Sequence, residues 1–345
     1  MQHYQLPEIN YPFPYNNLKI RNKRILNCIE DGSAFTIRRD VGYQYTIGKP
    51  VEISGIGLHS AVSVWIRLVP APANKGIVFR RTDLDNFEIA ASWKYIARVS
   101  YATSLMRRGV LISTTEHLLS ALVGSGIDNV IIEIDSLELP ILDGSSAPFL
   151  EMLKKAGKRQ QRAPRTYLKV LRPVEVIEGA KRIAIFPDEG FRINSSVDFP
   201  HPLVGRQSMD IEISQDHYAR EIAPARTFGF LDELPQMRNM GLIRGGSLAN
   251  AVVFTRDSVM NAEGMRFPDE CCRHKILDLI GDLALIGYPL HGYVVAERAG
   301  HAMHTALVLK LMRDRSLWEL TPSEDVPLEG RAPARELAVE QAASD

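Results

Sequence analysis

A histidine and two carboxylates recur at four-residue intervals late in the sequence, at His274, Asp278 and Asp282. On a helix this spacing places the three side chains on one face, each one turn from the next. An imidazole and a carboxylate presented in this way can hold one divalent metal ion, but two ligands do not complete a site. His117, which follows Glu116 at the start of an apolar run, is the best third ligand. A His2Asp set with an open fourth position is typical of a zinc hydrolase, in which Glu116 would be the general base.

Each part of this pattern alone is a weak indication of a metal. A histidine and an aspartate four residues apart on a helix more often form a surface polar pair. A glutamate in the first turn of a helix is favoured by the helix dipole, without any catalytic role. The joint pattern is more specific because of the motifs that surround it.

Short motifs accompany these residues along the chain. They are ISGIGLHS (53–60), LVPAPANKGI (68–77), FRRTD (79–83), STTEHLLSAL (113–122), GIDN (126–129), PILDGSSAPF (140–149), ARTFGF (225–230), GLIRGGS (241–247) and GHA (300–302). Together they resemble the UDP-3-O-acyl-N-acetylglucosamine deacetylases, the zinc amidases of bacterial lipid A synthesis. The motifs follow the order of that family, and the resemblance covers roughly residues 45–318.

The resemblance implies hydrolysis of the N-acetyl amide of a UDP-linked, 3-O-acylated glucosamine, with acetate as one product. It implies one catalytic zinc ion, held by His117, His274 and Asp278, which would lower the pKa of a bound water to about 7. Glu116 corresponds to the general base of the family. His301 corresponds to a cation that stabilises the oxyanion or protonates the leaving amine.

Two further residues correspond to supporting groups of this reaction. Asp282 matches the carboxylate that keeps His301 charged, since an ionised neighbour favours the cation. The hydroxyl of Thr227 would donate to the developing oxyanion, a contact worth ~10²–10³ in rate. The alternative for Thr227 is a strand residue paired with a neighbour. The other histidines considered are expected to be structural: His59, His201, His291 and His304.

Substrate binding is implied for a set of residues outside the metal ligands. Lys275 matches a lysine near the diphosphate, although a solvated lysine is the alternative. Asp198 and Phe199 match uridine contacts, and Arg298 corresponds to a basic residue near the nucleotide. The substrate-binding set expected from the resemblance is Lys275, Asp198, Phe199, Phe228 and Arg298. The acyl chain needs an apolar channel, which is expected in an insert at about 230–267, although about half of the apolar residues there would only form the insert's own core.

The resemblance implies an α+β fold of two similar domains, each a mixed β-sheet layered on helices. The active site would lie at the domain interface, with a β-α-β insert in the second domain. Strands, then helices, then a strand in both halves also suggest an internal duplication. We expect domains at 44–157 and 167–318 and a linker at 158–166. Residues 1–43 lie outside the family pattern, and the Pro-, Glu- and Ala-rich segment 319–345 predicts a disordered tail.

Periodicity and turn residues predict the individual elements. Strands are expected at 130–134, 167–177, 181–187, 191–198 and 292–298, with paired strands between 51 and 69. Helices are expected at 115–123, 147–156, 268–286 and 301–313, and a further helix is expected to begin near Gln215.

Composition excludes several classes of protein. The 345 residues carry 41 basic and 41 acidic side chains, which is not the basic excess of a general nucleic-acid binder. The 3 cysteines do not make a disulfide framework, and no apolar run approaches the ~18 residues of a membrane span. The N-terminus lacks the pattern of a signal peptide. We therefore expect a cytoplasmic, monomeric enzyme whose partners are the UDP-sugar and water, with peripheral proximity to a membrane left open.

Two other interpretations stay open. The chain could be a catalytically inactive relative that binds sugar nucleotides or lipids, although the complete set of Glu116, His117, His274, Asp278 and His301 argues against it. It could also be a zinc deacetylase of a sugar nucleotide without an acyl chain, against which the insert argues. Metal content, turnover, and a comparison of acylated with non-acylated substrate separate these alternatives.

Overall fold

The structure is a computed structural model that describes residues 42–97 and 101–323. The chain divides into two compact units, residues 1–40 and 41–345, and all the described residues belong to the second. All but the last two residues of the expected extension at 1–43 and most of the expected tail therefore lie outside the described residues. Among the residues that are described, no helix is both long and apolar enough to cross a bilayer.

The first half of the described chain forms a five-stranded mixed sheet in the order β2-β3-β8-β4-β5. The central strand β8 is antiparallel to β3 and parallel to β4. Its sequence VIIEI is almost entirely buried, as expected for a strand covered on both faces. Two helices, α1 (Glu116–Gly124) and α2 (Ala147–Ala156), complete this half. The strands are β2 (Val51–Ile56), β3 (Ser63–Pro70), β4 (Ile77–Arg81), β5 (Phe87–Ala90) and β8 (Val130–Ile134).

The second half repeats this arrangement in the order β11-β12-β17-β13-β14. Its central strand β17 is antiparallel to β12 and parallel to β13, which matches β8 between β3 and β4. The helices α5 (Glu270–Leu283) and α6 (His301–Arg313) correspond to α1 and α2. Two further strands, β10 and β18, extend the sheet from β17. The strands are β10 (Thr166–Val170), β11 (Val174–Glu178), β12 (Lys181–Phe186), β13 (Phe191–Phe199), β14 (Gly205–Glu212), β17 (Leu290–Glu297) and β18 (Trp318–Pro322).

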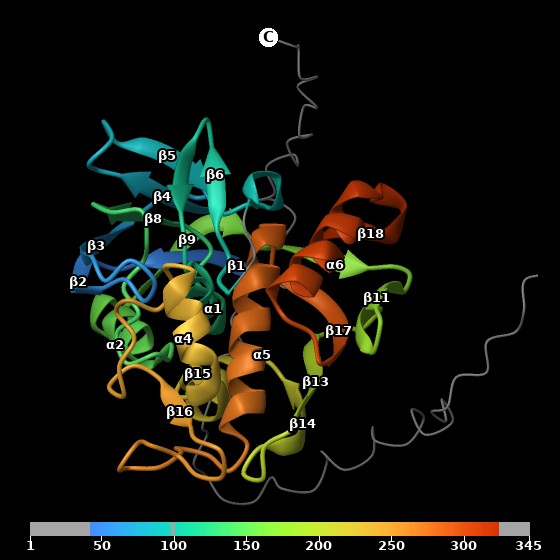
Figure 1. Cartoon of the computed structure of the whole chain (residues 1–345). Coiled ribbons are helices and arrows are strands. Elements are labelled where there is room, and N and C mark those ends of the chain that lie inside the picture. The colour runs from blue at the N-terminus through green and yellow to red at the C-terminus, as the bar shows by residue number, and fades with distance from the viewer. Residues whose placement is uncertain (1–41, 98–100, 324–345) are drawn as a thin grey trace, which may run out of the picture. The chain divides into compact units, whose positions relative to one another are not determined.

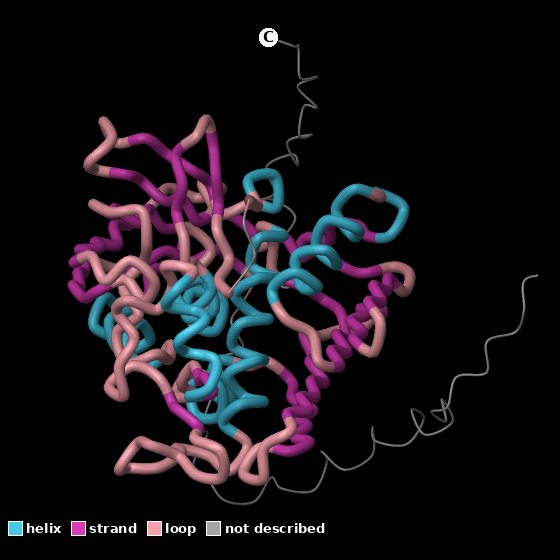
Figure 2. Tube along the Cα trace, viewed as in Figure 1, coloured by secondary structure: helices cyan, strands magenta, loops and turns pink. Residues whose placement is uncertain are grey.

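The two halves meet along α1 and α5, which pack against each other. A Cβ atom at Gly281 would lie 2.0 Å from the backbone oxygen of Glu116, so this close approach requires glycine. Each half keeps its own apolar core, around Phe79 in the first and around Ile185 in the second. Figure 1 shows α5 between the strands of the two halves, and Figure 2 shows the helices grouped between two sets of strands.

Each half carries an insertion between its fourth strand and its central helix. In the first half this is the antiparallel hairpin of β6 (Leu105–Arg107) and β7 (Val110–Ile112). In the second half it is β15 (Phe228–Phe230), α4 (Leu234–Asn239) and β16 (Val252–Phe254), with the two strands parallel. The expected β-α-β insert is present.

Short helical segments connect the larger elements. The helix expected near Gln215 is only the short α3 (Gln215–His217), which continues as a π-helical turn, Tyr218–Ile222. The 3₁₀ segments are Trp93–Tyr95, Leu231–Glu233, Ala284–Ile286 and Arg315–Leu317.

Two segments expected to be irregular form strands. The linker at 158–166 contains β9 (Lys158–Pro164), which pairs antiparallel with β1 (Tyr43–Ile47). Most side chains of β9 are exposed, so its polar sequence lacks an apolar period although its backbone is paired. The tail expected from 319 begins inside β18, which is held by antiparallel pairing with β10. The domain bounds of 44–157 and 167–318 stay predictions.

Candidate active site

Three donor side chains converge where α1 meets α5. His117 is the second residue of α1, and His274 and Asp278 lie one turn apart on α5; all three are buried. Their ligand atoms lie within 4.8 Å of one another. Asp278 Oδ1 lies 3.3 Å from His274 Nε2 and 3.6 Å from His117 Nε2. The structure therefore brings the three expected metal ligands together from the two halves.

This donor set fits a zinc ion. Zinc bonds of ~2.0–2.1 Å in a tetrahedron place two ligand atoms about 3.3 Å apart, which is close to the spacing here. His274 donates a hydrogen bond from Nδ1 to the Ala225 carbonyl at 3.1 Å, which leaves its Nε2 as a lone-pair donor. Burial lowers the pKa of His274 to about 3, against the opposing effect of Asp278, so the ring is neutral. His117 Nδ1 has no hydrogen-bond partner within the described part of the chain.

The second oxygen of Asp278 is held by Lys275, whose Nζ lies 2.9 Å from Oδ2. Burial alone would raise the pKa of Asp278, but the basic side chains around it hold that pKa well below its usual range. Asp278 is therefore ionised, as a metal-binding carboxylate must be. The Lys275 ammonium also lies 5.8 Å from the centre of the Phe228 ring, and both residues line the same pocket.

Glu116 and His301 line the pocket next to this donor set. His301 Nε2 lies 4.0 Å from Glu116 Oε1 and 3.8 Å from Asp278 Oδ2. Burial raises the pKa of the Glu116 carboxyl. Burial alone would lower the pKa of His301, but the carboxylates of Asp282 and Asp278 raise it to about 9. A carboxyl group that can accept a proton thus lies beside an imidazolium that can donate one.

Asp282 is fully buried behind His301. Its Oδ2 accepts hydrogen bonds from Nδ1 of His301 and Nδ1 of His304, each at 2.8 Å. Its Oδ1 accepts a hydrogen bond from the Thr103 hydroxyl at 2.5 Å. Neither the Thr103 hydroxyl nor His304 was expected as a partner of Asp282. His304 follows His301 by three positions on one helix, which was a usable signal, whereas Thr103 lies 179 positions from Asp282 and gave none.

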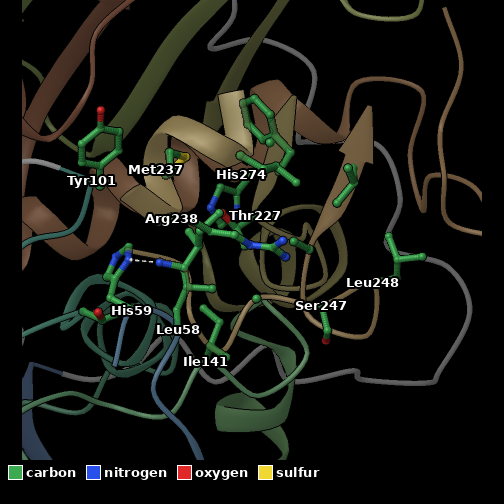
Figure 3. A pocket seen from close by; sticks show the side chains of 18 of the residues that line it. Leu58, His59, Tyr101, Ile141, Thr227, Met237, Arg238, Ser247, Leu248 and His274 are labelled. Atoms are coloured by element: carbon green, nitrogen blue, oxygen red, sulfur yellow. Dashed lines mark hydrogen bonds between the residues drawn. The ribbon is translucent and has the colours of Figure 1, made fainter. Parts of the chain in front are cut away.

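The pocket extends from these groups into the insert of the second half (Figure 3). It is a cavity of about 450 Å³ with mostly apolar walls. Leu58 and Ile141 line it from the first half, and Thr227 and His274 line it from the second. The residues that line it from the insert include Leu231, Leu234, Pro235, Met237, Ile243, Leu248, Ala251 and Val253. Val252 and Phe254 instead belong to the core of the second half.

Comparisons with known proteins identify the family of this chain. The family model described as UDP-3-O-acyl N-acetylglycosamine deacetylase matches residues 44–313. This chain belongs to that deacetylase family. The family that the sequence motifs indicated is therefore confirmed.

Relatives in this deacetylase family cover most of the chain. A UDP-3-O-acyl-N-acetylglucosamine deacetylase of Solibacter usitatus is 60% identical over 278 residues, which are 81% of this chain and 94% of that protein. The protein of the same name from Myxococcus xanthus is 46% identical over 288 residues, or 83% and 92% of the two chains. That of Syntrophotalea carbinolica is 42% identical over 289 residues, or 84% and 94%.

In this member of the deacetylase family, Thr227 is anchored at the base of the insert. Its backbone N–H donates to the Gly144 carbonyl at 2.8 Å, and its side chain lines the pocket. The preceding residue, Arg226, forms a buried ion pair with Glu270, the first residue of α5, at 2.9 Å. The insert is therefore tied at its start to the helix that carries His274.

The residues expected to bind the nucleotide of the deacetylase substrate fall into two groups. Phe199, at the end of β13, packs edge-on against the pocket residue Phe228 with ring centres 5.4 Å apart. Asp198 and Arg298 are exposed and form an ion pair with each other at 2.5 Å. Neither of these charged residues lines the pocket. Phe199 therefore packs against a residue of the pocket wall, whereas the ion pair of Asp198 and Arg298 lies outside the pocket.

Backbone strain accompanies two segments of the site in this deacetylase. Thr114 (φ 58°) precedes Glu116 by two positions, and Arg298 (φ 52°) precedes His301 by three. Left-handed φ is unusual for a β-branched residue and persists only where the surroundings fix it. The Thr114 hydroxyl donates to the buried carboxylate of Glu138 at 3.2 Å. The strained turn before α1 is therefore held by a buried contact.

Proposed function

We propose that this protein is a zinc amidase that hydrolyses the N-acetyl amide of UDP-3-O-acyl-N-acetylglucosamine, the committed step of lipid A biosynthesis. The products are acetate and UDP-3-O-acyl-glucosamine. The observation that carries the proposal is the convergence of Glu116 and His301 on a His2Asp donor set at one end of an apolar pocket. The family match and the names of the relatives support the choice of substrate.

One zinc ion would be held by His117, His274 and Asp278. Bound there, it would act as a Lewis acid that polarises the amide carbonyl and lowers the pKa of a water molecule. Because His117 comes from α1 and the other two ligands from α5, the packing of these helices sets the spacing of the three donors.

Glu116 is proposed to be the general base. Its Oε2 accepts a hydrogen bond from the Thr103 backbone N–H at 3.1 Å, which leaves Oε1 directed toward His301. Glu116 must be ionised to accept the proton of the attacking water. General bases of this kind contribute ~10²–10⁴ in rate.

His301 is proposed to be the cationic partner of Glu116. Asp282 accepts a hydrogen bond from its Nδ1, so Nε2 remains to donate to the oxyanion or to the leaving nitrogen. The Thr227 hydroxyl, on the pocket wall, would be a second donor to the oxyanion. A single donor of this type is worth ~10²–10³ in rate.

Substrate groups beyond the amide are assigned to the surrounding walls. The 3-O-acyl chain is proposed to occupy the apolar pocket, and Lys275 to bind near the diphosphate. Phe199 and Phe228 offer aromatic faces to the uracil ring, and Asp198 and Arg298 offer charged groups to the nucleotide. We propose a cytoplasmic, monomeric enzyme.

Acetate release from UDP-3-O-acyl-N-acetylglucosamine tests this function. Wild-type protein should turn over, lose activity on removal of the metal by a chelator, and regain it when zinc is restored. Unchanged turnover in protein shown to be metal-free would contradict the zinc mechanism. Equal turnover of the non-acylated sugar nucleotide would indicate a different substrate. Binding without turnover at full zinc content would indicate an inactive relative.

A further inference from the structure

Thr103 contacts three groups of the proposed reaction from one buried position in the loop before β6. Its hydroxyl donates to Asp282 Oδ1 at 2.5 Å and lies 3.3 Å from His301 Nδ1. Its backbone N–H donates to Glu116 Oε2 at 3.1 Å. Thr103 is therefore a residue of the first half that binds carboxylates from both halves.

Each of these contacts determines which carboxylate oxygen is available to the other partners. Because the Thr103 hydroxyl occupies Asp282 Oδ1, Oδ2 is left to accept from His301 and His304, each at 2.8 Å. Because the Thr103 amide occupies Glu116 Oε2, Oε1 is left 4.0 Å from His301 Nε2. The base and the imidazolium are thereby oriented by one residue.

The loop that carries Thr103 is itself bound to the start of α1. The Thr103 carbonyl accepts hydrogen bonds from the amide and the hydroxyl of Thr115, both at 3.2 Å. Thr115 directly precedes Glu116, so this loop and the general base are held together. Thr103 does not belong to the donor set that would hold the metal, and it does not line the pocket.

We propose that Thr103 is a positioning residue, which through its hydroxyl orients the Asp282–His301 pair relative to Glu116 for proton transfer. This inference rests on the proposed roles of Glu116, Asp282 and His301. Since Thr103 neither lines the pocket itself nor belongs to the proposed metal ligands, its side chain should control kcat and leave KM and zinc content unchanged. The backbone contact to Glu116 is retained in side-chain variants, so they isolate the hydroxyl.

The first test replaces the hydroxyl without changing the shape of the side chain. Thr103→Val should lower kcat by ~10–100-fold, the range typical of lost supporting hydrogen bonds around a site, with KM and zinc content within about twofold of wild type. Thr103→Ser, which keeps the hydroxyl, should recover kcat to within about threefold. The matched control is Thr46→Val, which removes a buried hydroxyl that binds only the Ala71 amide among its described contacts, at 3.1 Å. That control should keep wild-type kcat.

A double-mutant cycle tests whether Thr103 acts through Asp282. In an Asp282→Ala chain, adding Thr103→Val should lower kcat by less than about threefold, because the acceptor of its hydrogen bond is already gone. If the two effects multiply in full, or if Thr103→Val alone keeps wild-type kcat, the inference is wrong. If Thr103→Val does not fold, Thr103→Ala is measured in its place, with the same expectations. Full turnover of Asp282→Ala would instead overturn the proposed role of Asp282 itself.

Discussion

The two halves share one sheet order but carry their proposed site residues at different places on their helices. In the first half, Glu116 and His117 are the first two residues of α1. In the second half, three residues occupy successive turns of α5, and His301 begins α6. The start of α2, which corresponds to α6, has no such residue: Ser146 there donates to the backbone carbonyl of His117 at 2.8 Å. Both halves of the repeated scaffold therefore contribute residues to the proposed site, and the proposed metal ligands come from α1 and α5.

The two insertions show the same division. Thr103 lies two residues before the first strand of the hairpin insert, and Thr227 directly precedes the first strand of the β-α-β insert. The first contacts the buried carboxylates, and the second lines the apolar pocket. The residues just before the two inserts thus lie on the proposed proton-transfer side and on the proposed substrate side. The following predictions test this division, beginning with the largest expected effect.

Glu116→Gln tests the contribution of the first half to the chemistry. Turnover should fall by ~10²–10⁴-fold because glutamine cannot accept a proton. Zinc content should be unchanged, because the neighbouring ligand His117 is intact. Steady-state kinetics and metal analysis on one preparation measure both. A variant that keeps most of its turnover would remove Glu116 from the mechanism.

Asp282→Ala tests the contribution of the second half through the pH dependence of turnover. Activity should rise as Glu116 ionises, at a pKa that burial raises above its ordinary 4.5. It should fall as His301 loses its proton, at a pKa of about 9 that Asp282 and Asp278 hold up against burial. Removing Asp282 should therefore move the basic limb to lower pH and lower the maximum by ~10–100-fold. An unshifted basic limb would break the proposed pairing with His301.

Gly281→Ala tests whether the close approach of α1 and α5 sets the site. The added Cβ would lie 2.0 Å from the Glu116 backbone oxygen, so the helices must separate. We expect the free energy of unfolding to fall by about 1–3 kcal/mol or more, with weaker zinc binding. The control is Gly190→Ala, whose added Cβ would have its nearest neighbour at 3.8 Å. Equal stability and zinc affinity in the two variants would contradict the argument.

Removal of residues 1–40 should have the smallest effect. The family match begins at residue 44, and every proposed site residue lies beyond it. We expect kcat and KM within a few-fold of the full chain, measured by acetate release. A truncated protein that does not fold or turn over would show that this segment belongs to the active unit.

Much of the fold could be predicted from the sequence, because the pattern there is local. The helices expected at 147–156 and 301–313 are confirmed at those bounds, since their turns and apolar periods are clear. The strands β9 and β18 were missed because they depend on distant partners: β9 pairs with β1, and β18 with β10. A polar strand that is held only by backbone pairing has no alternation of apolar residues from which it could be predicted.

The same limit applies to the candidate site. His274, Asp278 and Asp282 could be grouped from the sequence because a helix spaces them one turn apart. His117 was chosen as the third ligand because it follows Glu116 at the start of an apolar run, and the family motifs supported it and added His301. The separation of these two histidines along the chain carries no geometric signal. Thr103 could not be identified, since nothing near it in the sequence indicates that its loop reaches α5.

The central claim is that one metal ion is held between the halves, and anomalous X-ray diffraction at the zinc edge tests it most directly. The described residues contain two His/Asp clusters: His117, His274 and Asp278, shared between the halves, and Asp282, His301 and His304, entirely from the second. In crystals of the full chain with one equivalent of zinc, we expect a single peak bonded to His117, His274 and Asp278. A peak only at Asp282, His301 and His304 would contradict the account, because the second half alone would then hold the metal.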